Sequence, residues 1–128
     1  MNNSEELKKW IESAVNKNKF NIETINYIFC SDKYLLKLNK QFLNHNYFTD
    51  IITFNNSTEK KKLNADIYIS VDRVKANAKR FDVTFRDELH RILVHGILHL
   101  TGFDDKNEKY RAEMRRAEDL WLMNRAFL

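Results

Sequence analysis

The segment His95-Gly-Ile-Leu-His-Leu-Thr-Gly-Phe-Asp-Asp105 contains both glycines of this 128-residue chain. Its two histidines are four residues apart, so on a helix their imidazoles project from the same face, one turn above the other. Gly102 follows at the place where a helix can end in a left-handed turn. Beyond such a turn the chain reverses, and one of the two aspartates that close the segment can approach the histidines. The segment therefore predicts a helix, a sharp reversal and three polar side chains that converge.

Two imidazoles and the carboxylate of Asp104 or Asp105 form a donor set for one metal ion. Because these three ligands leave at least one coordination position free, the pattern is typical of a catalytic metal rather than a structural one. The set suits Zn²⁺, and Fe(II) oxygenases use the same ligand types with open positions. A histidine pair on one helix followed by a turn favours zinc.

The residue after the first histidine helps to distinguish between substrate classes. A zinc peptidase of the common kind has a glutamate there as its general base, whereas this chain has Gly96. A phosphodiester is the next substrate class, because a metal can neutralise a phosphate oxygen and activate a water or a ribose hydroxyl.

The rest of the chain is typical of a small α+β protein. Apolar periodicity on the histidine helix, at Leu89, Ile92, Leu93, Gly96 and Leu100, predicts its buried face. Similar patterns predict helices over 4–17, from 31 or 32 to 43, from a cap at Asp72 to 80, from a cap at Thr84 to 101, and over 106–124. Strands are predicted over 25–30, 51–54 and 65–71, with a solvated loop over 55–64. The order α-β-α-β-β-α-α-α predicts one domain over residues 1–128, a short mixed β-sheet covered by helices.

Composition excludes some classes of protein. A hydrophobic fraction of 43% with 12% aromatic residues is typical of globular proteins. The chain has no apolar run near eighteen residues and no signal-peptide-like N-terminus, so we expect a cytoplasmic protein without a membrane partner. Its one cysteine, Cys30, excludes an intramolecular disulfide. The net charge of +4 and the pI near 9.2 permit a polyanionic partner such as RNA.

The histidine segment resembles the signature of the YbeY family of bacterial endoribonucleases, His-Gly-x-Leu-His-Leu-x-Gly-Tyr-Asp-His. Two further segments fit that family. Thr49-Asp-Ile-Ile-Thr-Phe54 is similar to its Thr-Asp-Val-Leu-Ser-Phe, and Ala65-Asp-Ile-Tyr-Ile69 is similar to its Gly-Asp-Ile strand. The order and spacing of all three segments agree, and together they cover nearly the whole chain.

The resemblance implies a zincin-like α+β fold, one zinc ion per chain and zinc-dependent cleavage of single-stranded RNA. It also implies a role in ribosomal RNA maturation, including the 3′ end of the small-subunit RNA, and in ribosome quality control. The expected partners are rRNA precursors and the ribosomal small subunit; no DNA partner is expected. The zinc ligands carried over are His95, His99 and Asp105, which would act in catalysis through the metal.

This sequence departs from the family pattern at two positions. Asp105 stands where the family usually has a third histidine, and its negative charge should make the zinc a weaker Lewis acid. Leu43 stands where the family often has an arginine thought to meet the phosphate backbone. Other cations would then contact the RNA, and the candidates are Lys40, Arg73, Lys75, Lys79, Arg80 and the lysines of residues 60–62.

Two further groups of polar residues lie on the last helix and before the strand predicted over 51–54. Arg111, Arg115 and Arg116 alternate with Glu108, Glu113 and Glu118, which predicts an exposed, ion-paired face of the last helix. Thr49 and Asp50 begin a strand near the expected site, and a role in the site and a turn-capping role are both open.

Two other functions compete with the nuclease. One is a ribosome-assembly factor that binds RNA or ribosomal protein and uses zinc mainly for structure, a reading that gains weight from Leu43. The other is a metallopeptidase-like hydrolase of a small substrate, which Gly96 weakens.

Overall fold

The computed structural model describes residues 4–125 and residue 127. Within them lie five helices and three strands: α1 (Ser4–Lys17), β1 (Asn21–Cys30), α2 (Asp32–Leu43), β2 (Ile51–Asn55), β3 (Lys62–Ser70), α3 (Val71–Arg80), α4 (Phe85–Leu100) and α5 (Glu108–Met123). The strands form one mixed sheet in the order β1-β3-β2, with β1 parallel and β2 antiparallel to β3. The predicted α+β class and element order are confirmed. No helix in the described part of the chain is both long and apolar enough to cross a membrane.

Two strands are longer at their N-terminal ends than the sequence pattern predicts. β1 begins at Asn21 rather than residue 25, and β3 begins at Lys62 rather than residue 65, so the predicted loop 55–64 is shorter. The extra residues pair with each other, with Asn21 opposite Lys62. Several of these residues are polar, so the sequence pattern does not indicate a strand there. The strand forms because its backbone pairs with a distant segment.

Helix caps also differ from the predictions at two places. The predicted cap of α3, Asp72, is wrong: the Ser70 hydroxyl accepts a hydrogen bond from the Arg73 amide at 3.1 Å, and Asp72 lies in the first turn. Ser70 ends β3 with extended backbone angles, which is what a cap requires. The last helix begins at Glu108 rather than at residue 106, because Asn107 caps it.

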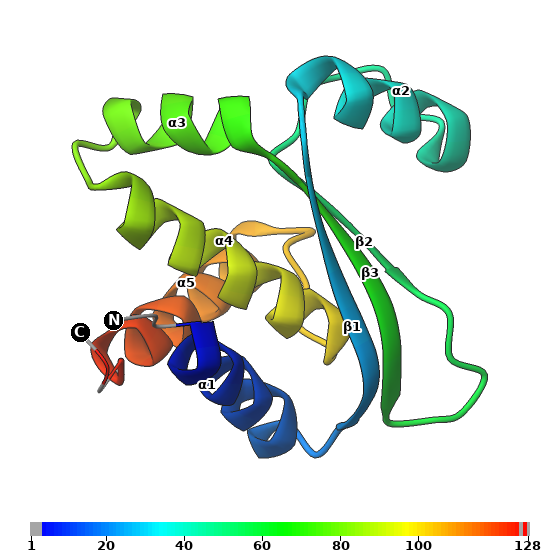
Figure 1. Ribbon diagram of the computed structural model, residues 1–128, viewed down its shortest axis with the longest axis vertical. Coiled ribbons are helices and arrows are strands. Elements are labelled where there is room, and N and C mark those ends of the chain that lie inside the picture. The colour runs from blue at the N-terminus through cyan, green and yellow to red at the C-terminus, as the bar shows by residue number, and fades with distance from the viewer. Residues whose placement is uncertain (1–3, 126, 128) are drawn as a thin grey trace.

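Side-chain alternation along the strands divides the core between the two faces of the sheet. On β3 the side chains of Leu63, Ala65, Ile67 and Ile69 are fully buried, and three of them join the main core with α1 and α4. A smaller cluster on α2, centred on Leu35, packs with Phe54 and Tyr68. Figure 1 shows α1 and α4 on one side of the sheet and α2 on the other.

Helix α4 runs through the middle of the molecule, where it contacts α1, α3, α5 and β2. Thr84 caps it as predicted, accepting from the Asp87 amide at 3.0 Å. Within the predicted stripe Ile92, Leu93 and Gly96 are buried, and burial extends to Val94, Ile97 and Leu98 because neighbours surround the helix. A Cβ atom on Gly96 would lie 2.7 Å from Ile51 Cδ1, so glycine lets α4 approach β2 closely.

Candidate metal centre

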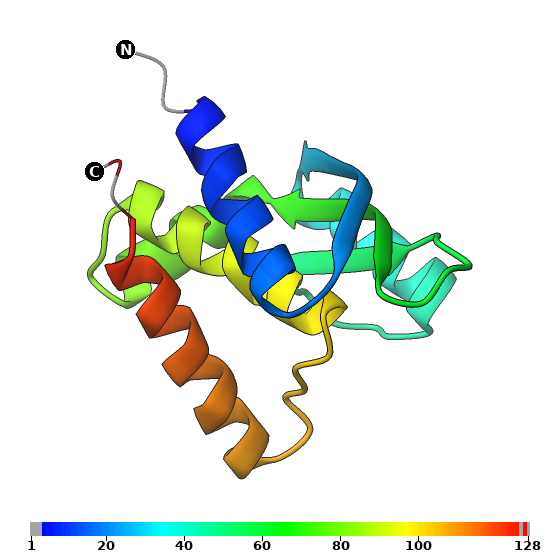
Figure 2. The same cartoon turned by 90° about the horizontal axis from the view of Figure 1, so that it is seen from below.

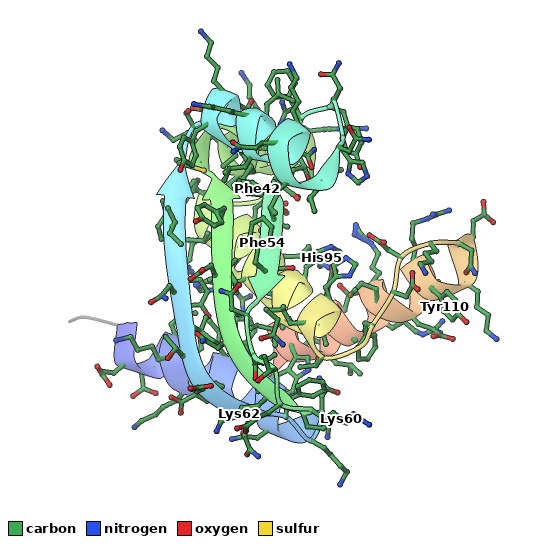
Figure 3. All side chains as sticks on the ribbon, turned by 90° about the vertical axis from the view of Figure 1, so that its right-hand side faces the viewer. Phe42, Phe54, Lys60, Lys62, His95 and Tyr110 are labelled. Atoms are coloured by element: carbon green, nitrogen blue, oxygen red, sulfur yellow. The ribbon has the colours of Figure 1, made fainter. Side chains whose placement is uncertain are left out.

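The three predicted ligands converge at the C-terminal end of α4. The rings of His95 and His99 are edge to face with centroids 4.7 Å apart. One ligand atom from each histidine and one from Asp105 all lie within 4.8 Å of one another. Figure 3 shows His95 in the space between α2 and the start of α5.

The turn after α4 brings Asp105 to the histidines. Gly102 has φ +111°, its amide donates to the His99 carbonyl at 3.2 Å, and the Phe103 amide donates to the Leu98 carbonyl at 2.9 Å. These two bonds form a Schellman motif, for which glycine is the preferred residue. The chain then reverses toward α5 (Figure 2).

Only one of the two candidate aspartates faces the histidines. Asp104 Oδ1 accepts from the Lys106 amide at 2.6 Å, so this carboxylate stabilises the local turn. Asp105 Oδ2 lies 3.3 Å from His99 Nε2. The geometry therefore favours Asp105 as the third ligand.

The donor set fits a small divalent cation. In a tetrahedral zinc site with ligand distances of about 2.1 Å, the ligand atoms lie about 3.4 Å apart. The His99 and Asp105 atoms have that separation already, at 3.3 Å. All three ligand atoms lie within 4.8 Å of one another.

A fourth residue, Glu118 of α5, contacts the candidate ligand His95. Its Oε2 lies 2.6 Å from His95 Nδ1, and its Oε1 accepts from Arg91 Nη1 at 2.8 Å. Arg91 also donates to Asp119 at 2.7 Å. Since Glu118 occupies Nδ1, the Nε2 atom of His95 is the one left for a metal, and a carboxylate on the other nitrogen orients a ligating histidine.

The prediction that Glu118 belongs to an exposed ion-paired face is wrong, because its side chain is buried. Alternating charges on a helix do not reveal which face docks on another helix. Met114, one turn earlier on α5, is also buried. An apolar residue at this spacing is the sequence feature that indicates the packed face of the helix.

Contact between His95 and Glu118 shifts the pKa of each side chain. Burial lowers the pKa of His95, but the hydrogen bond and charge of Glu118, together with Asp50, outweigh burial and raise it. Burial raises the pKa of Glu118, and the contacts with His95 and Arg91 outweigh this and lower it. Glu118 is therefore an anion that keeps a proton on His95 Nδ1.

Asp50 and Thr49 both lie at the site, and Thr49 also forms a hydrogen bond within its own turn. The Thr49 hydroxyl donates to the Ile51 carbonyl at 3.5 Å. Asp50 is half-buried, and its Oδ2 accepts from Asn77 Nδ2 at 3.5 Å. Burial raises the pKa of Asp50, although the charge of His95 partly offsets the effect.

Two hollows meet at the candidate ligands. Hollow A, about 870 Å³, lies among α3, α4 and α5, and hollow B, about 510 Å³, lies among α2, the segment 45–50 and β2. Asp50, His95 and Asp105 line both. Leu43, exposed by 40%, lines hollow B.

Comparisons with known proteins identify the family of this chain. A family model described as Endoribonuclease YbeY matches residues 1–125. The chain belongs to the YbeY family. Among its relatives, Endoribonuclease YbeY of Cytophaga hutchinsonii is 52% identical over 95% of this chain and 85% of the relative. That of Karelsulcia muelleri is 49% identical over 89% of this chain and 80% of the relative. The solution structure of TM1509 from Thermotoga maritima, 32% identical, covers 94% of this chain and 79% of that one with a TM-score of 0.66.

Since the relatives are endoribonucleases, the positions of the predicted RNA-contacting cations relative to the two hollows matter for substrate binding. Lys40, Lys75, Lys79 and Arg80 are exposed, and none of the predicted cations lines hollow A or hollow B. Arg73 donates to Asp32 at 3.0 Å. Lys60 and Lys62 lie at the opposite end of the sheet from α2 (Figure 3). Contact between RNA and these cations stays a prediction.

The arginines that do line hollow A come from α4, α5 and the residues after α5: Arg91, Arg111, Arg115 and Arg125. Sequence reasoning assigned the α5 arginines to ion pairs along the helix. Their approach to the metal ligands depends on how α5 docks on α4.

Proposed function

We propose that this protein is a zinc-dependent endoribonuclease that cleaves single-stranded RNA in cytoplasmic rRNA precursors, including the 3′ end of the small-subunit RNA. Membership of the YbeY family supplies the endoribonuclease activity on RNA. The zinc dependence and the single-stranded substrate are supported by one observation, the convergence of His95, His99 and Asp105 where two hollows meet. The helix-borne histidine pair and the turn after it also support the zincin-like classification.

In this proposal His95 Nε2, His99 and Asp105 hold the zinc. A zinc ion bound there supplies Lewis-acid chemistry, polarising a phosphate oxygen and lowering the pKa of a water. Because Asp105 adds a negative charge where the family usually has histidine, the Lewis acidity should be weaker than in relatives with three histidines.

The surrounding residues position protons. Glu118 holds the proton on His95 Nδ1, and Arg91 holds Glu118 in place. Asp50, which lines both hollows and whose Oδ2 accepts from Asn77 at 3.5 Å, would accept the proton of the attacking nucleophile. Its pKa, raised by burial, makes the carboxylate a better base than an exposed one.

The two hollows support a strand rather than a small substrate. A strand that crosses the ligands would have room on both sides of the cleaved phosphate, and unpaired RNA is flexible enough to follow such a path. A peptidase is disfavoured because Gly96 stands where the common zinc peptidases carry their glutamate base.

The test is cleavage of a single-stranded RNA, beside a duplex of the same sequence, by purified protein of known zinc content. We expect cleavage of the single strand only, its loss on chelation and its return with zinc. His95→Ala, purified identically, excludes contaminating ribonucleases. A His95→Ala, His99→Ala variant that keeps one zinc per chain would refute the ligand assignment. RNA binding by a zinc-loaded protein without cleavage would instead favour the ribosome-assembly factor.

A further inference from the structure

Two arginines of α5 face the metal ligands across hollow A. Arg111 and Arg115 are one helical turn apart, both are exposed, and both line the hollow that contains His95 and Asp105. Arg111 Nη1 donates to the backbone carbonyl of Asp105 at 3.2 Å, which places this guanidinium next to the third ligand.

The other two arginines of hollow A are already neutralised. Arg91 pairs with Glu118 and Asp119, at 2.8 and 2.7 Å, and Arg125 pairs with Asp87 at 2.9 Å. Among the residues that the structure describes, no carboxylate forms a salt bridge with Arg111 or Arg115. Their two charges are therefore available to an anion in the hollow.

The rest of the wall combines apolar side chains with carboxylates, of which Glu118 and Asp87 are paired with Arg91 and Arg125. Phe81, exposed by 51%, and Val83, exposed by 44%, line the same hollow. Guanidinium groups for phosphates together with an exposed aromatic ring for a base are the combination that binds single-stranded nucleic acids.

Leu43 provides no cation in hollow B, where the family often has an arginine. We propose that Arg111 and Arg115 bind the backbone phosphates of the RNA in hollow A, beside the scissile phosphate. The inference rests on the proposed function and assigns the substrate a side of the metal centre. Guanidinium donates paired hydrogen bonds to phosphate oxygens and stays charged at any working pH.

The experiment compares two double variants of the same helix. Arg111→Ala, Arg115→Ala removes the two charges in the hollow, and Lys109→Ala, Arg116→Ala removes two exposed charges that do not line it. The readout is the Kd of zinc-loaded protein for a 2′-O-methyl single-stranded RNA, measured over a series of salt concentrations. Thermal unfolding and zinc content show that each variant is folded and loaded.

We expect the hollow variant to bind at least about tenfold more weakly, and the control to change less than about twofold. Each phosphate contact to a single strand contributes about 0.7 to the salt slope, so losing two should reduce the slope by about 1.4. Arg111→Lys, Arg115→Lys should keep the salt slope, because it keeps both charges.

Equal weakening by the two double variants, or wild-type affinity in the hollow variant, would overturn the inference. A Lys75→Ala, Lys79→Ala variant that alone weakens binding would place the strand on α3 instead. If the wild-type protein neither binds nor cleaves single-stranded RNA, the proposed function fails and this inference fails with it. If the wild-type protein cleaves while the hollow variant binds normally, only the inference fails.

Discussion

Glu118→Gln is the sharpest probe of the metal centre, because it preserves shape and removes one charge. The carboxylate accepts from His95 Nδ1 at 2.6 Å and from Arg91 at 2.8 Å. An amide has one acceptor and one donor group, so it keeps only one of these contacts. If its oxygen stays with Arg91, its NH₂ faces His95 Nδ1 and drives the histidine proton to Nε2. A protonated Nε2 does not bind metal.

The expected loss of zinc affinity follows from the role of this contact. Removing the partner that orients a ligating histidine lowers metal affinity by roughly 10- to 100-fold. That range corresponds to about 1.4 to 2.8 kcal/mol of binding free energy. The metal-free variant should also lose about 1–3 kcal/mol of unfolding free energy, because neutral hydrogen bonds replace the charge-assisted bonds of Glu118 to His95 and Arg91.

The assay is a competition for zinc between the protein and a chromophoric chelator. Asp119→Asn is the matched control: it also weakens a carboxylate contact of Arg91, but Asp119 is exposed and its recorded partner is Arg91. We expect the control to change zinc affinity by less than about threefold, as for a surface ion pair. Wild-type affinity in Glu118→Gln, or an equal loss in Asp119→Asn, would refute the assignment of Glu118 as the residue that positions His95.

Three other changes test the pH dependence, the packing and the missing arginine. Burial, assisted by Arg125, lowers the pKa of His90 to about 4, so the unfolded state takes up a proton first as the pH falls. Stability should fall between about pH 6.5 and pH 4 by up to roughly 3 kcal/mol, and His90→Leu should flatten this dependence in urea unfolding. Gly96→Ala should destabilise the protein by about 1 kcal/mol in urea unfolding, because overpacking against Ile51 costs about 1–3 kcal/mol and helix propensity returns about 1. Adding Ile51→Val removes the colliding Cδ1 atom, so Gly96→Ala should cost less stability in the Ile51→Val protein than in the wild type. Leu43→Arg should raise cleavage of single-stranded RNA about tenfold, or about 1.4 kcal/mol, with unchanged zinc content.

Each of these expectations can fail clearly. An unchanged pH dependence in His90→Leu would mean that other groups cause the acid sensitivity. An equal cost of Gly96→Ala in the Ile51→Val protein and in the wild type would mean that the close contact with β2 is not the source of the loss. A folded, zinc-loaded Leu43→Arg protein with no gain in cleavage would mean that another cation already meets the phosphate.

The sequence by itself determined the local features of the site. The spacing of His95 and His99, the glycine turn at Gly102 and the cap at Thr84 involve residues within five positions of one another. Their geometry depends on backbone preferences and short-range hydrogen bonds, so it can be read from the order of the residues. The family signature added Asp105, and the turn geometry then favoured it over Asp104.

Only the tertiary structure decided what surrounds those ligands. Glu118 is 23 residues from His95, and its contact exists because α5 docks on α4 with the face that carries Met114. The placement of Asp50, the two hollows and the extra pairing of β1 with β3 depend in the same way on distant segments. Many helix faces and strand registers satisfy the local pattern, and burial of the whole core selects one of them.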